Sequence, residues 1–176
     1  HCNQSIIPTI QINGFIDIVA QDTHTCALQN TGNIICWGGI ITADGIKDPN
    51  PVSLKLAKKL EKGTDTTCAI LLDNSIECWG NTTCANLNGN TNTLLYDQIS
   101  VHMWGGCGIL KSTKSIKCWG NTNGTVPSDP NNKYLNISCG NTEDGIPSCC
   151  AIDINNDIEC FFPSGSIIPC PSSIVL

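Results

Sequence analysis

Apolar residues in this chain come in short runs, and each run leads into a polar turn within a few residues. The run at 26–28, for example, is followed by the turn Asn30-Thr31-Gly32-Asn33 and then by a second apolar run at 34–37. Short runs separated by turns of Asn, Asp, Gly and Ser are typical of β-hairpins. The pattern therefore predicts an all-β chain.

The hairpin pattern occurs four times in register. Each unit begins with a cysteine and an apolar strand, and after its turn it ends in a second cysteine followed by an aromatic residue. These second cysteines are spaced by 42, 40 and 42 residues, at Cys36, Cys78, Cys118 and Cys160. Self-similarity at a fixed period of this size indicates an array of repeated structural units.

A further β-like run precedes each hairpin, at 15–19, 52–56, 94–99 and 134–137. Residues 54–62 have helix-forming side chains, but the repeat register predicts a strand and a turn there. The units then span about 15–50, 51–93, 94–126 and 127–165, after an N-terminal segment, 1–14. Because the residues Ser-Ile-Ile-Pro at 5–8 recur at 166–169, we expect 166–176 to be a strand that opens an incomplete fifth repeat.

The two cysteines of each hairpin are predicted to form a disulfide bond. Cys26 and Cys36 are equidistant from Thr31, so they face each other across the hairpin, where opposed positions lie about 4.5–5.5 Å apart. The same reasoning pairs Cys68 with Cys78, Cys107 with Cys118, and Cys150 with Cys160. One additional residue in the third hairpin predicts a bulge or a longer turn. A fifth bridge, Cys139–Cys149, has the same spacing of ten residues.

Three cysteines remain outside these pairs. Thirteen cysteines leave one over after six bridges, so a bond between Cys2 and Cys170 would leave Cys84 for a bond between chains. This density of cysteines predicts a secreted, extracellular protein in an oxidising compartment. The chain starts at His1 without an apolar leader, which we interpret as a mature chain, and no apolar run of membrane-spanning length occurs in it.

The charged residues argue against a nucleic-acid partner. The formal net charge is −6, and all nine basic residues are lysines. Proteins that bind DNA or RNA place Lys and Arg on phosphates and usually Arg at base edges. Four acceptor sequons instead predict N-linked glycans, at Asn3, Asn81, Asn123 and Asn136.

The segment from Ile18 to Leu28, which contains His24-Thr25-Cys26-Ala27, is followed by Cys36-Trp37-Gly38. This string resembles the repeat of the regulator-of-chromosome-condensation (RCC1-like) propeller family, in its cysteine-bearing extracellular form. The resemblance extends over about 15–165 and implies four blade-like units, in a small ring or in an open arc. It is specific for the fold, because the motif recurs in register four times. It implies no particular function, because the family hosts unrelated functions.

No arrangement of residues predicts catalysis, a metal or a cofactor. The three histidines are His1, His24 and His102, and His24 belongs to the repeat motif, where we expect a structural hydrogen bond. The assignment of the cysteines to bridges argues against a Cys–His catalytic pair, and the sequence has no Cys-x2-Cys pair of the kind that binds zinc. The cluster Asp153, Asn155, Asn156 and Asp157 could offer oxygens to calcium, but a turn of Asn and Asp needs no metal.

The tryptophans divide into two groups. Trp37, Trp79 and Trp119 share one register position, so we expect each to pack against its own hairpin disulfide and the next unit rather than to stack on a glycan. Trp104 lies outside that register and is the candidate for an exposed aromatic contact.

The sequence therefore favours a non-catalytic, secreted glycoprotein. Our first hypothesis is a structural subunit of an extracellular filament or surface coat, a head-to-tail homopolymer joined through its terminal strands. The alternative is an extracellular recognition module that binds a protein or glycan through propeller loops.

Overall fold

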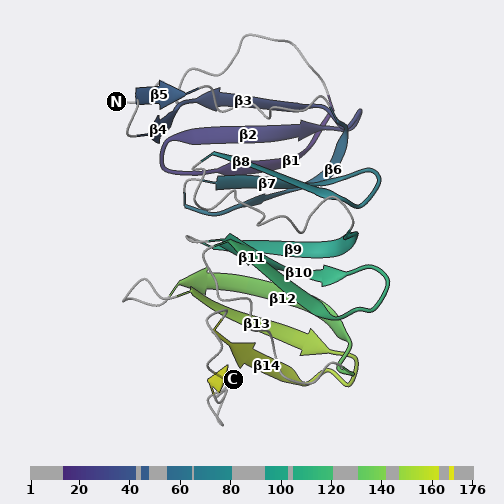
Figure 1. The fold of residues 1–176 in the computed structure, drawn as a ribbon. Helices are drawn as coiled ribbons and strands as arrows, with labels where there is room; N and C mark the ends of the chain where they lie inside the picture. The colour runs from purple at the N-terminus through teal and green to yellow at the C-terminus, as the bar shows by residue number, and fades with distance from the viewer. Residues whose placement is uncertain are drawn as a thin grey trace.

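The computed structural model describes residues 14–42, 45–47, 55–64, 66–80, 94–102, 105–120, 131–141, 147–162 and 167–168. All regular elements in these ranges are β-strands, which form four antiparallel sheets and one small hairpin (Figure 1). The prediction of an all-β fold with four repeated sheets is confirmed. In the described part of the chain, no helix has the length and apolar character needed to cross a bilayer.

Each sheet is a meander of three consecutive strands. The first contains β1 (Phe15–Ala20), β2 (His24–Gln29) and β3 (Ile34–Gly38), and the second contains β6 (Ala57–Lys62), β7 (Thr66–Leu71) and β8 (Ile76–Gly80). The third contains β9 (Tyr96–His102), β10 (Gly105–Leu110) and β11 (Ile116–Gly120). The fourth contains β12 (Tyr134–Asn141), β13 (Pro147–Asp153) and β14 (Ile158–Phe161), and the short β4 (Ile40–Thr42) and β5 (Gly45–Lys47) pair separately.

A fourth strand, β15 (Ile167–Ile168), extends the last sheet. Its two residues pair with Phe161 and Cys160 of β14. The sequence placed this segment at the start of a fifth repeat, whereas the structure pairs these two residues as the outer strand of the fourth sheet. Strand pairing satisfies backbone groups that the edge of β14 would otherwise expose.

The hairpin register agrees with the sequence-based prediction. Opposed cysteines occupy paired positions in β2–β3, β7–β8, β10–β11 and β13–β14. In the third hairpin the strands stay in continuous register from Gly105 to Ile109, so the additional residue lengthens the turn instead of forming a bulge.

The strand predicted at 52–56 is wrong at Lys55 and Leu56, which precede β6 and belong to no strand; 52–54 lie outside the described residues. Ala57 and Leu60 are buried while Lys58 and Lys59 are exposed. This spacing of three residues arises from a bulge between Ala57 and Lys59, which shifts the alternation of the strand by one residue. The bulge gives this strand a spacing of buried residues that resembles a helix, and for this reason the sequence pattern did not locate the start of β6.

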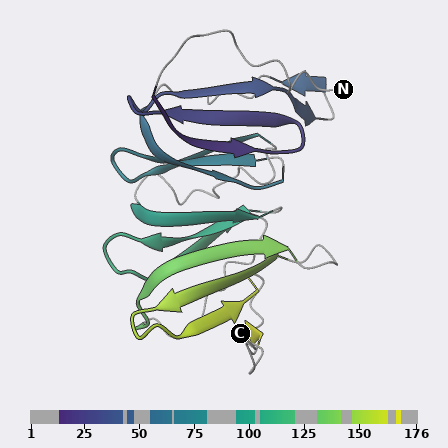
Figure 2. The same cartoon turned by 180° about the vertical axis from the view of Figure 1, so that it is seen from behind.

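The sheets follow one another in chain order, with the first at one end and the fourth at the other (Figures 1 and 2). An apolar core fills each of the three seams between consecutive sheets. A backbone hydrogen bond also crosses each seam, from the first residue of the later sheet to a carbonyl in the preceding hairpin turn. The donor–acceptor pairs are Ala57 N to Gly32 O (2.8 Å), Tyr96 N to Asn74 O (2.7 Å) and Tyr134 N to Lys114 O (2.9 Å).

Candidate functional site at the two end faces

Every sheet has two different faces. We call the side turned toward the preceding sheet the rear face and the side turned toward the following sheet the front face. In the seam between the second and third sheets, Ile70 and Ile76 form the front face, and Tyr96, Ile99 and Trp119 form the rear face that covers them. The other two seams use the same repeat positions.

The aromatic residue after the second cysteine belongs to the rear face. Trp79 packs in the core shared with the first sheet, and Trp119 packs in the core shared with the second. The core position that we predicted is therefore correct for Trp79 and Trp119, which pack against the preceding unit rather than the next, but not for Trp37. Phe161 holds the same position in the fourth sheet and is buried against the third.

The first sheet exposes an apolar rear face. Its residues Phe15 and Ile18 are 47% and 63% exposed. The register positions of Phe15 and Ile18 are held in the later sheets by buried residues, none more than 6% exposed: Ala57, Tyr96 and Tyr134 for the first, and Leu60, Ile99 and Ile137 for the second. Trp37, on the same face, is only half-buried.

The fourth sheet exposes an apolar front face. Ile158 is 49% exposed, although its counterparts Ile76 and Ile116 are buried. Cys150 is exposed, whereas its counterparts Cys26, Cys68 and Cys107 have no accessible surface. A groove of ≈ 240 Å³ crosses this face, lined by Asn136, Ile137, Ser138, Cys150, Ala151, Ile152 and Ile158. The two end faces thus carry the repeat positions that form the two sides of a seam within the chain.

Polar groups add specific contacts to the apolar seams. Asp17 Oδ2 accepts a hydrogen bond from Leu60 N at 3.0 Å, across the first seam. In the third seam, Gln98 Nε2 donates to Leu135 O at 3.1 Å, and Ser100 Oγ accepts from Cys139 N at 2.9 Å. In these two seams, side chains on the front face of a sheet's first strand therefore hydrogen-bond the backbone of the first strand of the following sheet.

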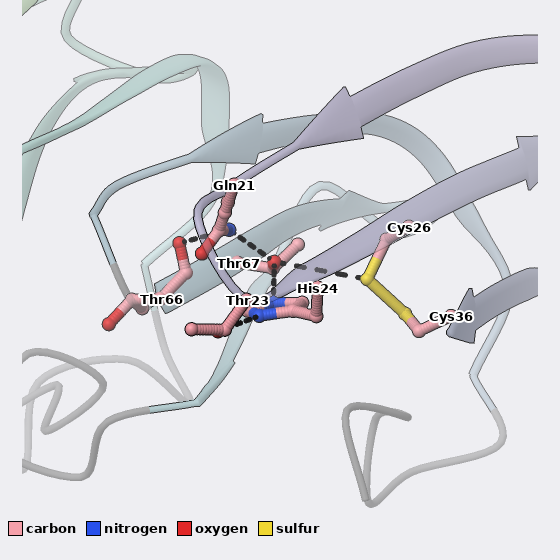
Figure 3. The surroundings of a disulfide bond; sticks show 7 residues. All are labelled: Gln21, Thr23, His24, Cys26, Cys36, Thr66 and Thr67. Carbon is pink, nitrogen blue, oxygen red and sulfur yellow. Dashed lines mark hydrogen bonds between the residues drawn. A yellow bond between two sulfur atoms is a disulfide. The ribbon is translucent and has the colours of Figure 1, made fainter. Parts of the chain in front are cut away.

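His24 ties the first sheet to the second. Its Nε2 lies 2.9 Å from Thr67 Oγ1, and Gln21 Nε2 donates to the same hydroxyl at 2.7 Å and to Thr66 O at 2.9 Å (Figure 3). His24, Gln21 and Thr67 are all buried, next to the Cys26–Cys36 bridge. This network is structural, as expected for His24, because the Thr67 hydroxyl hydrogen-bonds both His24 and Gln21 across the seam.

His102 gives the fold a predicted sensitivity to acid. Burial lowers the pKa of His102 to about 4. An unfolded histidine titrates near 6.5, so below that pH the unfolded chain binds the proton first. The free energy of unfolding therefore has its full His102 contribution above pH ~6.5. It decreases as the pH falls toward 4, by at most about 3 kcal/mol. We expect the free energy of unfolding of His102→Gln, measured by denaturant titration, to fall less over this range than that of the wild type. Equal slopes would contradict this explanation.

Five cysteine pairs lie at disulfide distance in the structure. They are Cys26–Cys36, Cys68–Cys78, Cys107–Cys118, Cys139–Cys149 and Cys150–Cys160, with S–S distances from 2.03 to 2.19 Å. Cys149 Sγ lies 3.7 Å from Cys107 Sγ, so two bridges touch across the third seam. Sequence spacing gave no signal for this contact. Cys107, Cys139 and Cys149 bring three sulfurs together, but bridged sulfurs are not thiolate ligands for a metal.

The Asn- and Asp-rich turn has an internal explanation. Asp153 Oδ1 accepts hydrogen bonds from the backbone N of Asn155 (2.8 Å) and of Asp157 (2.9 Å). Asp153 Oδ2 also accepts from Asn155 Nδ2 at 3.2 Å. The carboxylate thus closes its own turn, as Asp commonly does.

Several predicted site residues lie outside the described ranges, namely Cys2, Cys84, Cys170, Asn3, Asn81, Asn123, Trp104 and His1. Asn136 is described, and its side chain is exposed on β12. Its Oδ1 accepts a hydrogen bond from Ile137 N at 2.8 Å.

No protein-family model and no curated protein sequence matches this chain. Solved propeller structures do. The ectodomain of the receptor kinase CR4 from Physcomitrella patens superposes with a TM-score of 0.68 at 20% identity, over 89% of this chain and 43% of that chain. The CRINKLY WD40 ectodomain of the Arabidopsis thaliana receptor kinase ACR4 gives 0.64 at 22% identity, over 88% and 52%. Yeast RCC1 (Prp20), bound to Kap60, gives 0.62 at 15% identity, over 83% and 41%.

These likenesses show the fold. The chain is built of propeller-type blades and spans about half the length of the structures that it matches. The resemblance seen in the repeat motif is thereby supported at the level of the propeller fold.

Proposed function

We propose that this chain is a non-catalytic, secreted structural subunit that binds further copies of itself head to tail and so forms an extracellular filament or coat. The observation that carries this proposal is the pair of bare end faces. The front face of the fourth sheet and the rear face of the first present the two halves of an interface that already occurs three times within the chain.

The repeats indicate which surface would cover each end face. In the fourth sheet, Ile152 and Ile158 occupy the repeat positions of Ile70 and Ile76. In the second sheet, those two residues pack in one core with Ile99 of the third. Ile18 holds the position of Ile99. The rear face of a second copy therefore presents, at this position, the same kind of aliphatic side chain that the front face of the second sheet contacts within the chain. A head-to-tail contact of this kind is heterologous, and it produces a polymer when the rotation does not close.

The extracellular location rests on the cross-links. A chain with five bridged pairs is suited to an oxidising compartment. The likeness to two receptor ectodomains agrees with an extracellular module. The same likeness favours our second candidate function, a recognition module that binds a protein or glycan. In that case the groove beside Ile152 and Ile158 is the apolar surface available to the partner.

The test of the first proposal is the size of the non-reduced, secreted chain in solution. We expect light scattering to give a mass that grows with concentration in steps of one chain, and electron microscopy of stained particles to show elongated assemblies. A discrete two-copy ring would keep the head-to-tail contact and contradict the filament. A monomer at all concentrations would contradict both and favour the recognition module.

A further inference from the structure

One glycosylation sequon lies inside the proposed joint. Asn136 and Ser138 are the acceptor and the hydroxyl residue of Asn136-Ile137-Ser138, and both are exposed on β12. Between them, Ile137 is buried against the third sheet. Because side chains alternate along a strand, Asn136 and Ser138 lie on the opposite side, the front face, where they line the groove with Ile152 and Ile158.

The same two positions make contacts in the seams within the chain. Gln98 and Ser100 are their counterparts in the third sheet, and both hydrogen-bond the backbone of β12, at 3.1 and 2.9 Å. Asp17 is the counterpart of Asn136 in the first sheet and accepts a hydrogen bond from β6 at 3.0 Å. A docked copy would therefore place its β1 directly on Asn136 and Ser138.

A glycan at Asn136 and a docked copy would need the same space. In N-glycosylation, the Asn Nδ2 bonds to the anomeric carbon of a lipid-linked oligosaccharide diphosphate. The lipid diphosphate departs, and the amide loses one proton. Seam contacts at hydrogen-bond distance leave no room for a bulky saccharide.

We propose that Asn136 is a modification site that controls assembly: a glycan on Asn136 covers the front face and stops the addition of the next copy. This inference rests on the proposed head-to-tail function. A chain with a glycan at Asn136 can still offer its own rear face, so it can occupy only the front terminus of an assembly.

The experiment compares the secreted wild type with Ser138→Ala, which removes the sequon and keeps Asn136. Thr125→Ala, which removes the sequon at Asn123, is the matched control. Glycopeptide mass spectrometry gives occupancy at Asn136, and light scattering gives the assembly mass. We expect Asn136 to carry a glycan in only a fraction of the wild-type chains, so that the wild type assembles partly, with a several-fold higher mass for Ser138→Ala and a wild-type mass for Thr125→Ala.

Enzymatic removal of the glycan from the folded wild type provides a second readout without a substitution. A peptide N-glycosidase converts Asn136 to the side chain that Asp17 presents at the same position, and we expect assembly to follow. If wild-type chains that carry the Asn136 glycan assemble to the same mass as Ser138→Ala, the proposed control by the glycan is overturned and head-to-tail assembly still stands. An unoccupied Asn136 would also overturn it. Monomers of both Ser138→Ala and the deglycosylated chain would instead overturn head-to-tail assembly itself.

Discussion

The substitution Ile18→Asp is expected to reduce the assembled protein to monomers while the chain stays folded. Ile18 is 63% exposed on the rear face of the first sheet, so a carboxylate there remains hydrated in the monomer. In the joint, Ile18 would take the place that Ile99 holds between the second and third sheets. An unpaired carboxylate in such an apolar seam costs several kcal/mol. Light scattering on the non-reduced protein measures the loss.

The complementary substitution, Ile158→Asp, should have the same effect from the other side of the joint. Each variant then keeps one intact end face. Because the joint is heterologous, an equimolar mixture of the two variants should form discrete pairs that cannot grow further. A mixture that stays monomeric would contradict the front-to-rear contact, and so would a variant that still polymerises.

The matched control is Leu72→Asp. Leu72 is also an exposed apolar residue, 57% accessible, but it lies in the turn between β7 and β8 rather than on either end face. We expect Leu72→Asp to assemble as the wild type does. An equal loss of assembly in this variant would show that surface charge in general, and not the end faces, decides the mass.

The substitution Ile99→Ala is expected to destabilise the fold by about 2–5 kcal/mol, the usual cost of a cavity in a packed core. Ile99 is 2% exposed and packs between the second and third sheets. The same change at the equivalent position of the first sheet, Ile18→Ala, should alter monomer stability by no more than about 0.5 kcal/mol.

Both alanine variants are best compared on the Ile158→Asp background, which keeps the chain monomeric and so removes any contribution of assembly to stability. Denaturant titration under non-reducing conditions measures the two free energies of unfolding. Similar costs at the two positions would mean that the first sheet has a covered rear face after all, and that the joint is misassigned.

The local features of the fold were predictable from the sequence because each hairpin is defined by residues close together in the chain. Cys26 and Cys36 straddle one turn at equal distances, so their opposition follows from counting, and β2 and β3 pair in that register. Because the same local pattern recurs four times along the chain, it also predicted four similar sheets. The start of β6 was misplaced because a bulge in the strand breaks the alternation from which strands are recognised.

Only the tertiary structure distinguished Ile18 from Leu60, Ile99 and Ile137. All four are aliphatic residues at one repeat position, and their burial depends on whether another sheet precedes their own. The contact between Cys107 and Cys149, and the position of Asn136 on a bare face, were undetermined for the same reason. Local sequence determines pairing within a sheet, but exposure at a face depends on which neighbouring sheet covers it, and that neighbour is distant in sequence or belongs to another chain.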